Sequence, residues 1–159
     1  AAAMVYGSLA DAVSTYHEEC EKHDNPQRRA MCSYFIHIAD TPEEETYGRE
    51  SLIRYFHDAL LAAFPSDIKK MPPTMHYFTE IVDILKNMKP ESLTGKSILT
   101  GSTQSIIEQL KEVEASGVSE VILYFNYGLK PDAMVREQMD RFMREIAPSF
   151  DGAHSKLDL

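Results

Sequence analysis

Residues 30–40, "AMCSYFIHIAD", constrain the fold more than any other stretch of this sequence. The run is rich in residues that favour β-strands, and both of its alternating faces are largely apolar. A strand that is apolar on both faces is typical of a parallel sheet with helices on each side. One face would carry Met31, Ser33, Phe35, His37 and Ala39, and the other Cys32, Tyr34, Ile36 and Ile38.

Strand and helix patterns alternate along the rest of the chain. This alternation predicts right-handed βαβ crossovers and a parallel sheet. A complete (β/α)8 barrel needs ~250 residues, and this chain has 159. We therefore predict an α/β fold that amounts to about half a barrel, with an extra helical insertion. Extended runs are expected at 4–6, 97–101 and 120–125, and helices at 8–24, 41–65, 74–88, 103–117 and 131–148.

Charge and cysteine content narrow the class of protein. The chain has 16 basic and 25 acidic residues, a net charge of −9, which argues against a nucleic-acid surface. No apolar run approaches the ~18 residues that a membrane span needs, and the opening residues lack the basic region of a secretory signal peptide. Cys20 and Cys32 are too few for a disulfide framework. We expect a cytoplasmic protein with reduced cysteines.

Polar residues follow the apolar strands at the points where ligands bind in parallel α/β folds, the carboxyl ends of the strands. These ends are Met4, Tyr6 and Gly7, the stretch 37–40, and the stretch 126–128. A polar cap there predicts a ligand pocket. The alternative is a plain loop that needs asparagine and glycine for its turn, and spacing alone favours this alternative.

His37 has two interpretations. It lies on the more polar strand face with Ser33, so it could face a pocket, but a lone histidine in a strand is usually structural. The other histidines lack metal-ligand spacing. "TGKS" at 94–97 resembles the end of a phosphate-binding loop, but Pro90 replaces the required glycine. "GSTQS" at 101–105 could hold an anion at a helix start, and a plain N-cap explains it equally well.

The stretch "GSTQSIIEQLKEVEASGVSEVILYFNYGLKPDAMVREQMDRFMREIAPSF" resembles the C-terminal end of the luciferase-like, flavin-dependent monooxygenases. The matching parts are Gly101-Ser102, Ser116-Gly117-Val118, the strand 121–125 and Ala147-Pro148-Ser149-Phe150. Thr103 stands where the family usually has proline. Upstream, residues 7–45 match the family's order of strand, helix, strand and acidic helix start, so the similarity is diffuse but covers nearly all of residues 1–150.

The resemblance implies the C-terminal half of a TIM barrel over residues 1–150, with a tail at 151–159. It implies reduced FMN, supplied by a separate reductase, and O2 as the oxidant of a small organic or biosynthetic intermediate. One branch of the family accompanies polyketide or peptide synthases. By the match, residue 1 falls at about the sixth strand, so the catalytic residues are unknown, and residues 87–96 resemble the family's lid.

The cofactor contacts expected from these arguments are few. The resemblance points to Met4, Tyr6 and Gly7 as flavin neighbours, and the strand-end argument adds His37 and Asn126. Strand alternation predicts that Asn126 points to the cavity mouth on the side of Tyr6 and His37. Phe125 would then pack under the outer helices.

Two hypotheses from different classes follow. The first is the C-terminal part of a luciferase-like flavin monooxygenase, which would be inactive alone and would need its N-terminal half. The alternative is a non-catalytic half-barrel, a binding or scaffold module completed by a homodimer or a partner chain. Both hypotheses predict that the open side of the sheet associates with another chain, because it has an unpaired strand edge.

Overall fold

A computed structural model describes residues 8–27, 29–65, 70–76, 78–95 and 97–150. Three parallel strands form its sheet, in the order β2-β1-β3. The central strand is β1 (Met31–Ile38), with β2 (Ile98–Gly101) and β3 (Glu120–Tyr124) on its two sides. The predicted α/β class, the parallel pairing and these three strands are confirmed.

The two outer strands pair with different halves of β1. β2 runs beside its carboxyl-terminal half, from Phe35 to Ile38. β3 runs beside its amino-terminal half, from Met31 to Phe35. The end of β3 therefore lies level with the middle of β1, and the chain after β3 continues along the rest of that edge.

One face of the sheet is covered by the segments that follow β1. These are α2 (Pro42–Arg54), a π-helix η2 (Tyr55–Leu60), the 3₁₀ turn η3 (Leu61–Ala63) and, after the turn η5 (Pro73–Met75), α3 (Phe78–Asn87). The turn η6 (Pro90–Ser92) then leads to β2. The core on this side contains Leu52, Phe56, Leu85, Leu93, Ile98 and Tyr127.

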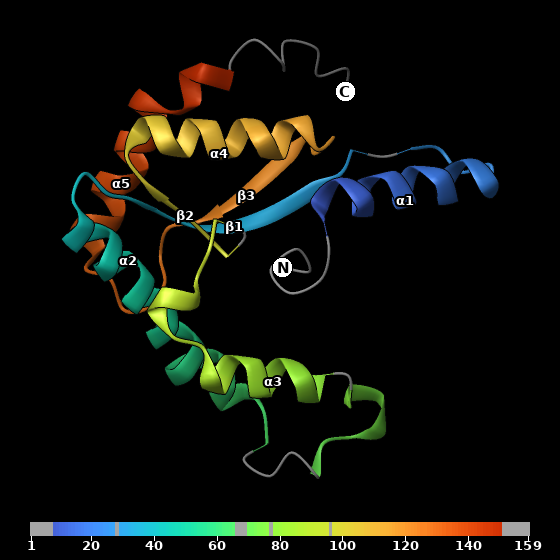
Figure 1. Cartoon of the computed structure of the whole chain (residues 1–159), viewed down its shortest axis with the longest axis horizontal. Helices are drawn as coiled ribbons and strands as arrows, with labels where there is room; N and C mark the ends of the chain where they lie inside the picture. Colours follow the sequence, from blue (N-terminus) through green and yellow to red (C-terminus); the bar gives the residue numbers. More distant parts are fainter. Residues whose placement is uncertain (1–7, 28, 66–69, 77, 96, 151–159) are drawn as a thin grey trace.

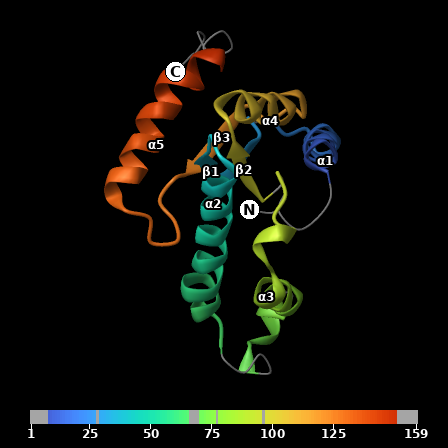
Figure 2. The ribbon, with the colours of Figure 1, turned by 60° about the vertical axis from the view of Figure 1, so that its left-hand side comes forward.

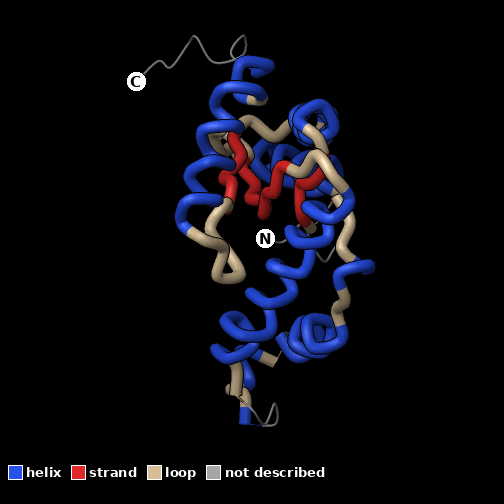
Figure 3. Tube along the Cα trace, turned by 90° about the vertical axis from the view of Figure 1, so that its left-hand side faces the viewer, coloured by secondary structure: helices blue, strands red, loops and turns tan. Residues whose placement is uncertain are grey.

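The opposite face is covered by helices from both ends of the chain. They are α1 (Leu9–Lys22), α4 (Thr103–Ala115), α5 (Asp132–Glu145) and the short helix η7 (Ala147–Phe150). Figure 1 shows α4 on one side of the sheet and α3 on the other, and Figure 3 shows the strands between layers of helix. This larger core contains Val13, Tyr34, Ile36, Ile38, Leu99, Ile106, Leu110, Val113, Val118 and Ile146.

Polar side chains cap the starts of three helices. Thr41 and Glu44 form a complete capping box at the start of α2. Ser8 Oγ accepts a hydrogen bond from the Asp11 N–H at 3.5 Å, and Ser102 caps α4 in the same way. The helix expected from Thr74 begins later, at Phe78, because a 3₁₀ turn precedes it.

The half-barrel itself is not confirmed. Consecutive strands are neighbours in a barrel, whereas here β3 pairs with β1 and not with β2. A barrel also places its helices on one face, whereas this open sheet has helices on both. The physical reason is the central strand, which is apolar on both faces and buries each under helices. The strand expected at 4–6 lies outside the described residues.

Candidate functional site

A pocket with aromatic walls lies beside β1 and β3, on the face covered by α2. It has a volume of about 280 Å³ and is lined by Ser33, Phe35, Tyr55, Phe56, Leu60, Tyr124 and Asn126. We call this the aromatic pocket. Phe35 is its centre, with ring centroids of Tyr55, Phe56 and Tyr124 at 5.4, 5.9 and 5.5 Å. These are the distances of favourable edge and offset ring contacts.

The parallel register brings the strand residues of the pocket together. Phe35 of β1 is the partner of Tyr124 of β3, and partners in neighbouring strands share one face of a sheet. Asn126 lies two residues after Tyr124 and lines the same pocket. The pocket is therefore built where β3 ends.

The third wall is the π-helix η2, which continues directly from α2. Its i→i+5 pattern widens the helix and places Tyr55 and Leu60 one turn apart. Both side chains line the pocket, and Phe56 is buried beneath it. π-helical segments occur frequently at functional sites, and the sequence pattern of 41–65 gave only a helix here.

The orientations predicted for Phe125 and for Asn126 relative to His37 are confirmed, while Tyr6 lies outside the described residues. Asn126 is exposed and lines the aromatic pocket, on the face of β1 that carries His37. Phe125 points to the other face and packs edge-on against Phe142 of α5 at 5.8 Å.

Tyr127 and Gly128 stabilise the chain after β3 against β1 and α2. The Tyr127 hydroxyl donates to the Ile36 carbonyl at 3.3 Å. Gly128 has a φ of +64°, and a Cβ there would lie 2.0 Å from the carbonyl oxygen of Ser51. The turn explanation therefore holds for Gly128, whereas Asn126 lines the aromatic pocket.

His37 does not line the aromatic pocket. Its side chain is buried against Gly48 of α2, with the Tyr47 ring at 5.7 Å. Burial, and secondarily the charge of Lys130, lower the pKa of His37 to about 4, while Glu44 opposes the shift. Its Nδ1 has no hydrogen-bond partner among the described residues. At neutral pH His37 is an uncharged residue of the sheet–helix layer.

The other residues expected at the site are only partly visible. Met4, Tyr6 and Gly7 lie outside the described residues. Within the segment compared to a lid, Leu93 is buried in the core with Leu52 and Leu85. Arg49 also donates a hydrogen bond to the Leu93 carbonyl. Contacts of Leu93 with Leu52 and Arg49 therefore hold the described part of this segment against α2.

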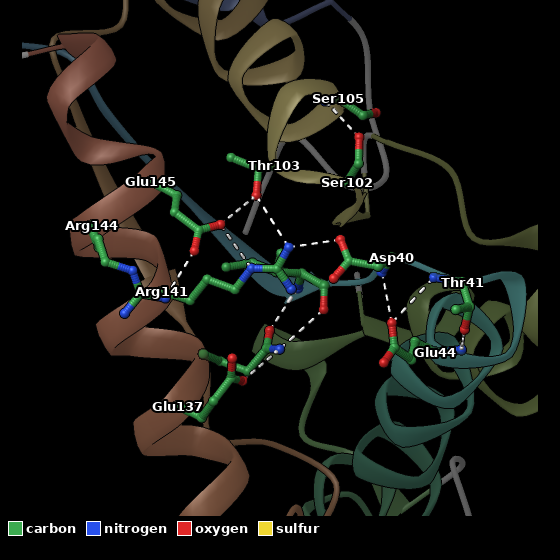
Figure 4. Close-up of polar contacts among 12 residues, drawn as sticks. Asp40, Thr41, Glu44, Ser102, Thr103, Ser105, Glu137, Arg141, Arg144 and Glu145 are labelled. Atoms are coloured by element: carbon green, nitrogen blue, oxygen red, sulfur yellow. Dashed lines mark hydrogen bonds and ion pairs between the residues drawn. The ribbon is translucent and has the colours of Figure 1, made fainter.

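A charged cluster occupies the carboxyl ends of β1 and β2 (Figure 4). Arg141 of α5 contacts Asp40 at 2.7 Å and Glu145 at 3.0 Å. Thr103, at the start of α4, donates to Glu145 at 3.0 Å. The hydrogen bond from Arg141 lowers the pKa of Asp40. Hydrogen bonds from Arg144 first, and then Arg141, lower the pKa of Glu145 to about 2.

This cluster leaves little to attract an anion. Two carboxylates already neutralise the Arg141 guanidinium. Glu44 accepts the Asp40 and Thr41 N–H groups at the start of α2, and Ser102 caps α4. Sequence reasoning missed the cluster because Asp40 and Arg141 are 101 residues apart.

β3 pairs only with the amino-terminal half of β1. Along the carboxyl-terminal half, two side chains from later in the chain bond to the same edge. The Gln138 amide accepts from the Ile38 N–H at 2.7 Å and donates to the Ile38 carbonyl at 3.0 Å, as a neighbouring strand would. The Lys130 ammonium lies 3.6 Å from the centre of the Tyr127 ring and contacts the Ile36 carbonyl at 3.5 Å. Burial lowers the pKa of Lys130 to about 7.

In the described part of the chain, no group of three or more histidine, cysteine, aspartate or glutamate side chains could hold a metal ion. No helix in the same residues is long and apolar enough to cross a membrane. Comparison of the sequence with protein-family models and with curated proteins finds no match.

Proposed function

We propose that this chain is the C-terminal part of a cytoplasmic flavin-dependent monooxygenase of the luciferase-like kind. Reduced FMN, supplied by a separate reductase, and O2 would oxygenate a small organic or biosynthetic intermediate. The observation that carries the proposal is the aromatic pocket at the end of β3. The sequence resemblance over residues 1–150 favours a flavin over other flat ligands.

The residues of the aromatic pocket fit the ring system of a flavin. Phe35, Tyr55 and Tyr124 offer aromatic faces and edges, against which a flat conjugated ring packs favourably. The Asn126 amide can donate to and accept from the polar edge of such a ring. The volume, about 280 Å³, lies at the lower end for small-molecule sites, which suits a ring system better than a whole nucleotide.

The described residues do not fit the phosphate of FMN. Asp40 and Glu145 bind Arg141, and the starts of α2 and α4 are capped by the chain's own side chains. The phosphate would therefore be held by another part of the complete protein. When bound, reduced flavin supplies the electrons for oxygen activation, and the residues described here hold the ring and shield it from water.

The half-barrel belongs to the same proposal. In the isolated chain β3 pairs with β1. A barrel formed with an N-terminal half would require β3 to pair with β2 instead. We propose the barrel arrangement only for the complete protein.

A second candidate function has one observation in its favour. Met31, Ile122 and Tyr124 are exposed large apolar residues on the strands beside the aromatic pocket. Exposed apolar patches mark interaction surfaces. A non-catalytic binding or scaffold module that is completed by a second copy or a partner chain would use this surface.

Substitution of Asn126 tests the flavin proposal against the turn explanation. The probe is lumiflavin, which carries the flavin ring without the ribityl chain or the phosphate. We expect Asn126→Ala to weaken lumiflavin binding by about fivefold to tenfold, because one hydrogen bond to the ring is lost. The melting temperature should stay unchanged. Titration by flavin fluorescence beside thermal melts measures both. Asn87→Ala, which removes an exposed amide on α3, is the matched control and should change neither. A stability defect with unchanged affinity would remove Asn126 from the site.

A further inference from the structure

Arg54, the last residue of α2, differs from the other arginines that the structure describes. Those other arginines each form an ion pair with a carboxylate; they are Arg29, Arg49, Arg136, Arg141 and Arg144. Arg54 forms no ion pair within the described part of the chain. Its positive charge is therefore not neutralised by any carboxylate in that part.

The Arg54 side chain is held at the segment that follows β3. Its Nη1 donates to the Gly128 carbonyl at 3.1 Å. Glu50 and Asp58 stand four residues before and after Arg54, a spacing at which helical side chains can pair. Neither carboxylate is within ion-pair distance of it. A guanidinium has several further N–H donors, and those of Arg54 make no other hydrogen bond to the described residues.

Both ends of this contact adjoin the aromatic pocket. Tyr55, the next residue of the chain, lines the pocket. Gly128 lies two residues after Asn126, which lines the pocket as well. Arg54 therefore places its charge beside the wall that Tyr55 and Asn126 form. This is the side on which the proposed function sets the polar edge of the flavin ring.

The charge of a flavin depends on its redox state. The oxidised ring is neutral, whereas the reduced ring readily loses a proton at N1 and then carries negative charge over N1 and the C2 carbonyl. The chain as a whole has a net charge of −9, which repels an anion. A cation at the polar edge of the ring would offset this repulsion for the reduced form and leave binding of the neutral form nearly unchanged.

We propose that Arg54 makes the aromatic pocket selective for the reduced, anionic form of the flavin ring, by placing its positive charge beside the N1 and C2 carbonyl edge. The inference rests on the proposed function, in which reduced flavin arrives from a separate reductase and has to be retained. Arg54 is exposed, so water and salt screen its charge, and we expect a preference of about tenfold.

Titration of the ¹⁵N-labelled chain under nitrogen, with oxidised lumiflavin and with lumiflavin reduced by dithionite, measures this preference. Lumiflavin has no phosphate, so the difference between the two forms reports the charge of the ring alone. Binding of the reduced form that is about tenfold tighter should raise the midpoint potential of lumiflavin by about 30 mV at saturating protein. Added salt should reduce the preference.

Arg54→Gln removes the charge and keeps a donor for the Gly128 carbonyl. It should lower the preference to about twofold without changing the affinity for oxidised lumiflavin or the melting temperature. Arg54→Lys keeps the charge and should retain most of the preference. Arg136→Gln is the matched control, because it makes the same change in net charge at an exposed position on α5, and it should leave the preference intact.

The outcomes separate this inference from the proposed function. Absence of lumiflavin binding in both redox states would refute the two together. Binding of oxidised lumiflavin with no preference for the reduced form, or a preference that Arg54→Gln leaves intact, would overturn the inference alone. Arg54→Gln that weakens both forms equally, or that lowers the melting temperature, would show that Arg54 only holds the turn at Gly128, and would overturn the inference as well.

Discussion

At the scale of single residues, three consecutive residues after β3 have three different roles. Asn126 lines a pocket, Tyr127 pairs with the edge of β1, and Gly128 provides a close turn against α2. Sequence spacing could not separate these tasks, because asparagine and glycine suit both turns and ligand sites. The requirement for glycine at position 128 comes from the backbone of Ser51 in α2, which is distant in the sequence.

Gly48 of α2 should be intolerant of alanine. Glycine in a helix usually costs about 1 kcal/mol relative to alanine, so the substitution would normally stabilise. Here a Cβ would lie 2.6 Å from the His37 ring, and we expect Gly48→Ala to destabilise by about 1–3 kcal/mol through overpacking. Urea unfolding measures the change.

The double variant supplies the control for this prediction. In a His37→Ala background the clash partner is gone, and Gly48→Ala should then become neutral or stabilising. A loss of stability that persists without the His37 ring would show that the strain has another origin.

Lys130 should make stability depend on pH. Its pKa falls from 10.5 to about 7 on folding, so the unfolded chain binds more protons between these values and stability rises with pH across that window. Lys130→Met should flatten the rise, which is at most about 1.4 kcal/mol per pH unit. Equal slopes for both proteins in urea unfolding at pH 7 and pH 9.5 would contradict the assignment.

His37 adds a second window at lower pH. Its pKa falls from 6.5 to about 4 on folding, so stability again rises with pH between these two values. The same unfolding series extended to pH 4 should show this rise, and His37→Ala should remove it.

At the scale of elements, the edge of β1 depends on one side chain from α5. Gln138→Leu would leave the Ile38 N–H and carbonyl without partners, and each unsatisfied buried group costs about 1–3 kcal/mol. We expect that loss of stability and faster hydrogen exchange at the Ile38 amide. Gln104→Leu is the control, because Gln104 bonds only to Glu108 on the exposed side of α4. Similar losses in both variants would mean that the edge contact contributes little.

The elements themselves were largely predictable from the sequence, and their arrangement was not. The helix start at Thr41 and the apolar strand at 31–38 are local signals, and both appear as expected. Alternation of strands and helices predicts parallel pairing for barrels and open sheets alike. Strand order depends on contacts between distant segments, so the half-barrel did not follow from the pattern.

The candidate site was likewise predictable only in part. The orientation of Asn126 follows from strand alternation, a period of two that the sequence displays. Two of the aromatic side chains, Tyr55 and Phe56, come from the π-helix η2, which is distant from β3 in the sequence and which a pattern of period 3.6 does not reveal. The position of His37 under Gly48 likewise depends on how α2 crosses the sheet.

At the scale of the whole molecule, the sheet face that carries the aromatic pocket has exposed large apolar residues, Met31, Ile122 and Tyr124. Figure 2 shows α5 and α2 flanking the sheet, with α1 beyond α4. β3 pairs with β1 on one side, and its other edge meets no strand among the described residues. An unpaired strand edge next to exposed apolar side chains favours association.

We expect the chain to self-associate through this face, and more strongly at high salt, because salt screens the repulsion between chains of net charge −9. Ile122→Lys should shift the protein toward monomer in light scattering. Ile84→Lys on α3 is the matched control, since Ile84 is 42% exposed and Ile122 47%. A wild-type monomer at high concentration, or an equal effect of both substitutions, would contradict the assignment of this surface.

The central claim is that the aromatic pocket receives a flavin ring, and contacts between protons test it most directly. Lumiflavin carries the ring without the ribityl chain or the phosphate, so it isolates this interaction. With ring-labelled phenylalanine and tyrosine, the account predicts intermolecular nuclear Overhauser effects from the lumiflavin methyl groups to Phe35 and Tyr124. It also predicts none to Tyr34, which lies on the opposite face of the sheet. Effects confined to other aromatic residues, or no effects at saturating lumiflavin, would contradict the claim.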